Sequence, residues 1–516
     1  MGPDVPPFLV ECRPGTQLRS PSSPMRSALA ALARQTVVYG LSGVILPFVG
    51  LITLPIFARY FSPAKYGVIE IATVTSALVY VFIDLGLAAG SQRSYFDYTD
   101  EQETQRRGVI KTAVLTSFTI ACAVASIFVA LASPIGDALF KSRNYTTVVV
   151  LVGITLPFTV VMQLSREVMR LTFRPWHYFV SATMSGVIAA GVGVVAVLSL
   201  KSDVAGVFWG LLFGSALAAA YGVTAVHRSL SGRVSRPELR TMLAYGIPLM
   251  PTALAGWGLV FLDRFLLGGL GNLAAVGQYA VANRVVSVLL FAVTAFSLAF
   301  SPYILSLYSE DRELELQTRA QVLSYLAIAL TGVGVALSVF AREIIALVAP
   351  SYGSAYESVA LLSFGTIAFG LGTVAMTGIS FVRATHWFAI YTIIAVAVNL
   401  LVNLVLIPPF GQVGAAAATA VAYALLAVLY YRKAQQLYPT PFETARVLRT
   451  TGLGALVMPI GLIAIHPAGL GVAVHAAAIA AFVLLLRPLG IIGAREWDAL
   501  REVFANRAAA LTGTRA

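Results

Sequence analysis

A few charged side chains interrupt the long apolar stretches of this sequence, and they are the residues best suited to bind a ligand. Arg284 lies seven residues inside the apolar run 277–304, and Asp263 and Arg264 close the preceding run, 241–262. A charge inside a membrane-spanning segment costs at least ~2.5 kcal/mol on insertion scales, so such residues usually serve a function. Because a guanidinium binds phosphate oxygens in a bidentate geometry and stays charged, these arginines suit an anionic diphosphate.

Two other interpretations of Arg284 are open from the sequence. The residue lies roughly 10 Å from the end of its span by helix rise, so its long side chain could extend to the lipid headgroups. Alternatively, Asp263 could hold it in a structural salt bridge. Neither interpretation requires a ligand.

A second group of charges lies toward the opposite face of the membrane. Asp84 is inside the apolar run 67–90, Lys111 is three residues into the run 108–132, and Arg93 lies in the turn between them. These three residues could form one buried cluster. The alternative is that Lys111 and Arg93 extend to the headgroups and that one of them neutralises Asp84.

Neutral polar residues and prolines inside the spans give weaker signals. Asn399 and Asn403 are four residues apart on one helical face and are expected to bond neighbouring helices rather than a ligand. A proline inside a membrane helix removes a backbone hydrogen bond and bends the helix. Such bends could serve gating, and the candidate residues are Pro47, Pro55, Pro248 and Pro251.

The composition places these residues in a polytopic membrane protein. Of 516 residues, 58% are hydrophobic and 11% are charged, against roughly 25% charged residues in a soluble protein. The two cysteines and five histidines show no disulfide or metal-ligand spacing, so no metal and no cofactor is predicted. The net charge of +12 comes from arginines in short links between apolar runs, which favours membrane orientation over nucleic-acid binding.

The apolar runs predict an all-α protein of about fourteen transmembrane helices. A bilayer core of about 30 Å requires roughly 20 apolar residues per helix. The predicted spans are 36–58, 67–90, 108–132, 146–165, 178–200, 204–226, 241–262, 277–304, 322–341, 357–382, 386–407, 412–431, 450–466 and 468–487.

The distribution of Lys and Arg predicts the orientation of these spans. With both termini in the cytoplasm, 26 of the 35 basic residues lie in cytoplasmic segments and 7 lie outside, while Lys111 and Arg284 fall within spans. Cytoplasmic loops of membrane proteins carry such an excess of basic residues. The loops are short. No Walker motif is present, so ATP is not expected to drive the protein directly. No long extracytoplasmic loop carries paired acids, which argues against a membrane glycosyltransferase or a polysaccharide polymerase, so the chain is predicted not to be an enzyme.

The two halves of the chain resemble each other. Aligning Tyr39-Gly40 with Tyr245-Gly246 gives an offset of 206 residues and predicts a parallel duplication. The predicted units are a disordered cytoplasmic tail (1–35), a first six-helix bundle (36–226), a cytoplasmic linker (227–240), a second six-helix bundle (241–431), a cytoplasmic loop (432–449), two additional helices (450–487) and a cytoplasmic tail (488–516).

Five short segments, in order and at the ends of spans, resemble one protein family. They are ARYFSPAKYG (58–67), DLGLAAGSQR (84–93), IPLMPTALAGWGLVFLDRFLL (247–267), GQYAVANRV (277–285) and APSYGSAY (349–356). Together they resemble the polysaccharide biosynthesis proteins, the Wzx-type flippases of the multidrug/oligosaccharidyl-lipid/polysaccharide superfamily, over residues 36–487.

The resemblance implies a multi-pass protein of the bacterial inner membrane whose two bundles form a V, with spans 1, 2, 7 and 8 around a cationic cavity. Such proteins move an undecaprenyl-diphosphate-linked oligosaccharide to the outer leaflet, for O-antigen or exopolysaccharide. A proton or sodium gradient is implied as the driver, with membrane lipids and a polysaccharide polymerase as possible partners.

The resemblance also implies roles for individual residues. Arg284 and Lys111, with Arg264 and Arg93, would contact the diphosphate in the cavity. Asp84 and Asp263 would couple an ion or restrain the arginines.

Three other functions remain open at this point. A drug or cation antiporter of the same superfamily typically has a carboxylate in span 1, and residues 36–58 contain none. A lipid II flippase would be expected to have an arginine and an acid there, which are also absent. A scaffold of a polysaccharide assembly complex would not need isolated charges within its spans.

Overall fold

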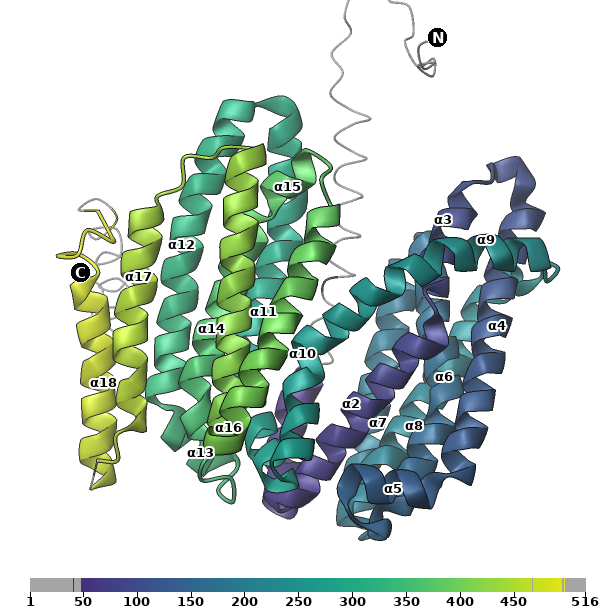
Figure 1. Ribbon diagram of the computed structural model, residues 1–516, viewed down its shortest axis with the longest axis horizontal. Helices are drawn as coiled ribbons and strands as arrows, with labels where there is room; N and C mark the ends of the chain where they lie inside the picture. Colours follow the sequence, from purple (N-terminus) through teal and green to yellow (C-terminus); the bar gives the residue numbers. More distant parts are fainter. Residues whose placement is uncertain (1–39, 41–47, 466, 494–495, 497–516) are drawn as a thin grey trace, which may run out of the picture.

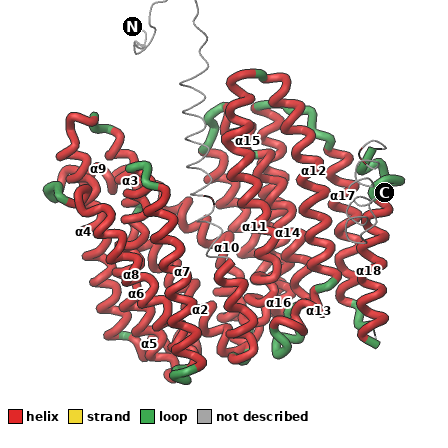
Figure 2. Tube along the Cα trace, turned by 180° about the vertical axis from the view of Figure 1, so that it is seen from behind, coloured by secondary structure: helices red, strands yellow, loops and turns green. Residues whose placement is uncertain are grey.

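The computed structural model describes residue 40, residues 48–465, residues 467–493 and residue 496. The predicted N-terminal tail, Pro47 and almost all of the predicted C-terminal tail lie outside these residues. Within them the chain is helical and contains no strand, as the apolar periodicity predicts (Figure 2).

The helices form two lobes that follow each other along the chain. A helix at Phe48–Tyr60 precedes them. The first lobe contains α2 (Pro63–Asp84), α3 (Leu87–Phe96), α4 (Glu103–Ala130), α5 (Ala132–Phe140), α6 (Thr146–Leu171), α7 (Pro175–Leu198) and α8 (Asp203–Val226). The connection and the second lobe contain α9 (Arg236–Gly246), α10 (Met250–Leu270), α11 (Leu273–Glu310), α12 (Arg312–Val339), α13 (Ala341–Val348), α14 (Tyr356–Ala375), α15 (Thr377–Phe381), α16 (His386–Leu437), α17 (Thr444–Val457) and α18 (Ala468–Leu485).

Ten of the described helices are long and apolar enough to cross a membrane, which confirms a multi-pass membrane protein. The number of fourteen spans stays a prediction, because Phe48–Tyr60 and Gly469–Leu485 are shorter apolar helices. The long helix α16 covers two predicted spans. Its backbone leaves the helical conformation at Gly411 (φ 53°, ψ −126°), directly after Pro408, Pro409 and Phe410.

The two lobes meet at one end and diverge toward the other, so the molecule has the outline of a V (Figure 1). At the closed end, α2 packs against α10 and α11. The open end carries α3, α9 and α15 and the beginning of α12. This is the end at which the basic residues of the sequence concentrate, and it is called the arginine-rich end below.

A symmetric pair of glycines forms the closest contact at the closed end. A Cβ atom on Gly67 would overlap the carbonyl oxygen of Leu273, and one on Gly277 would overlap the carbonyl oxygen of Pro63. Each glycine therefore lets the first turn of one helix approach the first turn of the other. Gly67 and Gly277 are equivalent in this contact and are 210 residues apart. The alignment of Tyr39-Gly40 with Tyr245-Gly246 gave an offset of 206, which is about one helical turn shorter.

The chain crosses between the lobes through α9 and α10. The helix α9 packs on α3 and α4 of the first lobe, with the backbones of Gly86 and Gly246 in close contact. The 3-10 turn Ile247–Leu249 follows and contains Pro248, and Pro251 lies in the first turn of α10, which packs against α16. The helix is thus interrupted at Pro248, between α9 and α10. The segment 241–262, which was predicted as the first span of the second bundle, begins on α9, where it packs on the first lobe.

Pro55 does not interrupt its helix. The segment Phe48–Tyr60 continues through it as one α-helix.

Candidate functional site

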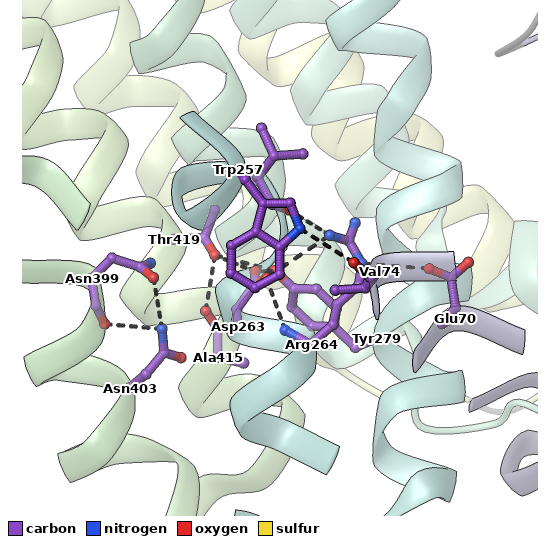
Figure 3. Close-up of polar contacts among 11 residues, drawn as sticks. Glu70, Val74, Trp257, Asp263, Arg264, Tyr279, Asn399, Asn403, Ala415 and Thr419 are labelled. Atoms are coloured by element: carbon purple, nitrogen blue, oxygen red, sulfur yellow. Dashed lines mark hydrogen bonds and ion pairs between the residues drawn. The ribbon is translucent and has the colours of Figure 1, made fainter. Parts of the chain in front are cut away.

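Four charged side chains from three helices meet near the closed end of the V. Glu70 comes from α2, Asp263 and Arg264 come from α10, and Arg284 comes from α11. Glu70 lies between the two arginines, with Oε2 3.6 Å from Nε of Arg264 and Oε1 3.8 Å from Nη2 of Arg284. The ion pairs therefore connect α2 of the first lobe with α10 and α11. Figure 3 shows the pair between Glu70 and Arg264.

Asp263 is the most firmly held member of this group. Its carboxylate accepts hydrogen bonds from the hydroxyl of Tyr279 on α11 and from Oγ1 of Thr419 on α16, the latter at 2.8 Å. Nη1 of Arg264 lies 3.9 Å from its other oxygen. A buried carboxylate needs such partners, and here they join three helices of the second lobe (Figure 3).

Arg264 is buried beside this carboxylate. Its Nη1 donates to the carbonyl oxygen of Val260 at 2.5 Å, and its guanidinium lies 5.5 Å from the ring centres of both Phe261 and Tyr279. Nε is buried, and among the described residues it has no hydrogen-bond partner. Its nearest carboxylate, Glu70, stands at an ion-pair distance.

Arg284 is the accessible cation of the group. Its side chain is 34% exposed, against 7% for Arg264 and 15% for Glu70. It also interacts with Tyr66 of α2. A Cβ atom on Gly50 would lie 2.5 Å from its Nη1, so the glycine in the helix Phe48–Tyr60 leaves the space that the guanidinium occupies.

The group as a whole is electrically balanced, with two carboxylates and two guanidiniums. An anion can therefore bind Arg284 strongly only if it displaces Glu70 or if Glu70 is neutralised. The salt bridge between Asp263 and Arg284 considered from the sequence is not the one formed, because Arg284 pairs with Glu70 instead.

The sequence matches the family described as polysaccharide biosynthesis protein over residues 56–361, which is more than half of the chain. The chain belongs to this family. The resemblance seen in the five sequence motifs is thereby confirmed.

Two curated relatives share part of their length with this family member. The probable low-salt glycan biosynthesis flippase Agl15 of Haloferax volcanii is 23% identical over 48% of this chain and 52% of its own length. An uncharacterized membrane protein of Methanocaldococcus jannaschii is 26% identical over 37% of this chain and 38% of its own length. The chain therefore spans about half or less of the curated relatives it matches.

Solved structures share the fold at low sequence identity. The lipid II flippase MurJ in an inward closed conformation superposes with a TM-score of 0.69 at 14% identity, covering 88% of this chain and 99% of MurJ. An inward-facing multidrug transporter of the MATE family superposes with a TM-score of 0.63 at 11% identity, covering 81% and 96% of the two chains. This family member thus shares its fold with these two proteins.

Glu70 is the residue that sequence reasoning missed. It lies inside the predicted span 67–90, so the rule that selected Asp84 from that span selects Glu70 as well. Nothing in the sequence marks Thr419 as a site residue, because it lies in the run GAAAATA (414–420), whose small residues indicate close helix packing. Tyr66 and Tyr279 also lack a signal, since tyrosines are numerous near the ends of the spans.

The structure does not bring Asp84, Arg93 and Lys111 together. Asp84 accepts a hydrogen bond from the backbone of Ala88 at 3.2 Å and thereby supports the start of α3. The exposed Arg93 pairs with Asp97 at 2.5 Å. Lys111 lies among apolar residues of α4, α6 and α8. The buried cluster that was one of the two alternatives from the sequence is therefore not formed.

The two asparagines of α16 bond each other rather than a neighbouring helix. Nδ2 of Asn403 donates to both the backbone and side-chain oxygens of Asn399 at 2.9 Å, within one helix (Figure 3). Both residues are buried.

A second buried ion pair lies at the arginine-rich end of the second lobe. Oε1 of Glu315 is 3.0 Å from Nε of Arg319, and neither side chain is exposed. The Arg319 guanidinium also bonds Thr440 and lies 4.7 Å from the ring centre of Tyr438. Burial and a hydrogen bond to Glu315 raise the pKa of the Tyr438 hydroxyl to about 12. The Glu315–Arg319 pair of α12 bonds Tyr438 and Thr440 in the segment that follows α16, and it thereby holds this segment against α12. Its role is structural.

Proposed function

We propose that this protein is a flippase that moves an undecaprenyl-diphosphate-linked oligosaccharide across the bacterial inner membrane by alternating access. The single observation that carries the proposal is the position of Arg284, an accessible cation between the lobes that is paired with Glu70. Family membership supports a role in polysaccharide biosynthesis. The name of the haloarchaeal relative, a probable glycan biosynthesis flippase, supports the flippase activity.

The diphosphate competes with Glu70 for the arginines. Its oxygens accept a bidentate pair of hydrogen bonds from Arg284, which replaces part of the hydration that the headgroup loses. The oligosaccharide occupies the space between the lobes, and the polyprenyl chain stays in the bilayer. Arg264 remains fixed by Asp263 and its backbone contact, so it contributes positive potential rather than direct capture.

Glu70 couples the cycle to an ion gradient. When the diphosphate takes Arg284, the carboxylate of Glu70 loses one of its two arginine partners, which favours its binding of a proton or a sodium ion. Release of the headgroup on the other side restores the ion pairs. The ion then crosses together with the headgroup, so an imposed proton or sodium gradient changes the rate of transport.

The closed end of the V acts as the outer gate. The arginine-rich end faces the cytoplasm, with both termini on that side, because cytoplasmic segments carry the excess of basic residues. In this orientation the lobes are open to the cytoplasm, and transport requires Gly67 and Gly277 to separate from the opposing helix. The proline-containing turn between α9 and α10 absorbs the change in angle. A polysaccharide polymerase takes the product at the outer face.

Transport into vesicles tests this proposal. Purified protein is reconstituted with a fluorescent undecaprenyl-diphosphate oligosaccharide, and translocation is measured by its accessibility to an external enzyme or quencher. We expect Arg284→Gln to lower the rate at least tenfold at equal protein level, while Arg93→Gln, which removes an exposed cation paired with Asp97, retains it. Equal rates for wild type and Arg284→Gln would overturn the role of the site, and absence of transport by wild type would overturn the function.

A further inference from the structure

Lys111 lies at the edge of an apolar cavity on the flank of the first lobe. The cavity has a volume of about 400 Å³ and lies between α4, α6 and α8, with Val114, Phe158 and Val161 among its lining residues. All of its other lining residues are apolar. Among the described residues, Lys111 has no hydrogen-bond or ion-pair partner. An apolar cavity on the outer side of the lobe, with one unpaired cation beside it, is therefore left unexplained by the transport site.

A second cavity with one cation in its lining lies on the flank of the second lobe, and Tyr431, Thr444 and Thr451 add hydroxyl groups to its wall. Its volume is about 370 Å³, and it lies between α12, α14, α16 and α17, with Arg432 as its charged lining residue. Within the part of the chain that the structure describes, Arg432 likewise has no partner. In the second lobe α17 forms one wall of the cavity, and no helix lines the corresponding side of the first cavity among its described lining residues.

The two cavities are equivalent positions of the duplicated fold. On α6 and α14 the lining residues correspond at an offset of 210, since Phe158 matches Ala368 and Val161 matches Leu371. On α8 and α16 the offset is 208, and it relates Ala216 to Ala424, Ala219 to Ala427 and Ala220 to Val428. Such a match at several positions on two helices indicates that the apolar walls of the two cavities correspond, while the cation comes from α4 in the first cavity and from α16 in the second.

Both cavities lie at the arginine-rich end and away from the space between the lobes. Lys111 is in the third turn of α4, and Arg432 is near the end of α16, both at that end of the molecule. Among the described residues that line the two cavities, none belongs to α2, α10 or α11, the helices that carry the charged site. The cavities therefore open toward lipid near one headgroup layer of the membrane.

We propose that the two cavities are equivalent binding sites for an anionic phospholipid of the leaflet at the arginine-rich end. One acyl chain of the lipid fills the apolar cavity, where its burial is favourable in proportion to the area covered. The phosphate lies beside Lys111 in the first site and beside Arg432 in the second. A basic residue at the mouth of an apolar interhelical pocket is a chemistry that selects anionic headgroups. A zwitterionic lipid carries its own cation, which reduces the attraction.

Native mass spectrometry of the full chain with phosphatidylglycerol and phosphatidylcholine tests this inference. We expect wild type to retain up to two phosphatidylglycerol molecules and to prefer them at least fivefold over phosphatidylcholine. Lys111→Gln and Arg432→Gln should each lose one bound molecule, and the double variant should lose the preference. Inorganic phosphate should not displace the lipid, because it cannot fill the cavity.

Two further variants separate the cavity from general electrostatics. Ala220→Phe fills the first cavity from its exposed wall and should remove one lipid with Lys111 intact. Arg228→Gln removes an exposed cation at the same end but outside the cavity, and it should retain both lipids. Retention of both lipids by the Lys111→Gln, Arg432→Gln double variant, or an equal loss in Arg228→Gln, would overturn the proposal. Because Arg284 lines neither cavity, the lipid-binding result does not depend on the outcome of the transport assay.

Discussion

Glu70 and Arg284 form an ion pair that joins the two lobes near the closed end of the molecule, with Oε1 of the acid 3.8 Å from Nη2 of the arginine. The same carboxylate faces Arg264 through its other oxygen. One acidic residue thus faces both Arg284, which would bind the proposed diphosphate, and Arg264, which would add positive potential. The balance between this acid and a bound anion is the basis of the first prediction.

Replacing Glu70 with glutamine should strengthen substrate binding and slow transport. The variant leaves the site with one net positive charge, so the dissociation constant for the diphosphate-linked lipid should fall about tenfold, on the order of 1.4 kcal/mol. Turnover should fall because the bound state is stabilised and the coupling group is lost. Binding is measured with the fluorescent lipid in detergent, and initial transport rates are measured between pH 6 and 8.

The pH series separates coupling from a simple loss of activity. Wild type should respond to an imposed proton gradient, and Glu70→Gln should respond less than twofold. The matched control is Glu310→Gln at the exposed end of α11, which should behave as wild type. A Glu70→Gln protein that transports at the normal rate and still follows the gradient would exclude Glu70 as the coupling residue.

Asp263→Asn should lower stability more than it lowers substrate affinity. The carboxylate is buried and accepts hydrogen bonds from Tyr279 and Thr419 beside Arg264. Removing its charge leaves the buried guanidinium undercompensated, which we expect to cost about 2 to 4 kcal/mol. The melting temperature in detergent measures this loss. Arg284→Gln, whose side chain is partly exposed, should melt close to wild type.

Gly67→Ala should weaken the closed end of the V. The added Cβ would overlap the carbonyl oxygen of Leu273, and the backbone on both sides must shift. Overpacking of this kind typically costs about 1 to 3 kcal/mol, so we expect a lower melting temperature and increased labelling of a cysteine placed at the closed end. Gly269→Ala on α10 is the control, because no atom lies within 4 Å of its added Cβ. Equal behaviour of the two variants would argue against a tight gate.

Arg319→Ala should be among the most destabilising single substitutions in the second lobe. It leaves Glu315 buried without its partner, and breaking such a pair costs about 3 to 5 kcal/mol. The double variant Glu315→Leu, Arg319→Met removes both charges and should recover at least half of that loss. Protein yield and melting temperature measure both effects. A double variant less stable than the single one would show that Glu315 stabilises the fold independently of Arg319, through the hydrogen bond it accepts from Tyr438.

The amino-acid sequence by itself determined the membrane character of the protein, the order and approximate ends of its apolar helices, and the candidate arginines. These are local properties, because hydropathy, proline content and charge within a span can be read from neighbouring residues. The family resemblance also came from short local motifs. The same rule applies to Glu70, which lies three residues inside the predicted span 67–90, as Lys111 does in the span 108–132, but Glu70 was not among the predicted site residues.

Only the tertiary structure decided which charges meet. Residue spacing places Arg284 on α11 but does not say whether it faces Asp263 or Glu70, because that depends on how α2 and α11 cross at the closed end. Lys111 and Arg284 looked alike in the sequence, as single cations inside spans, yet one borders an apolar cavity on the flank and the other pairs with an acid between the lobes. The physical reason is that the rotation and crossing of helices are set by packing between segments about 210 residues apart, as at Gly67 and Gly277, and no local pattern contains that information.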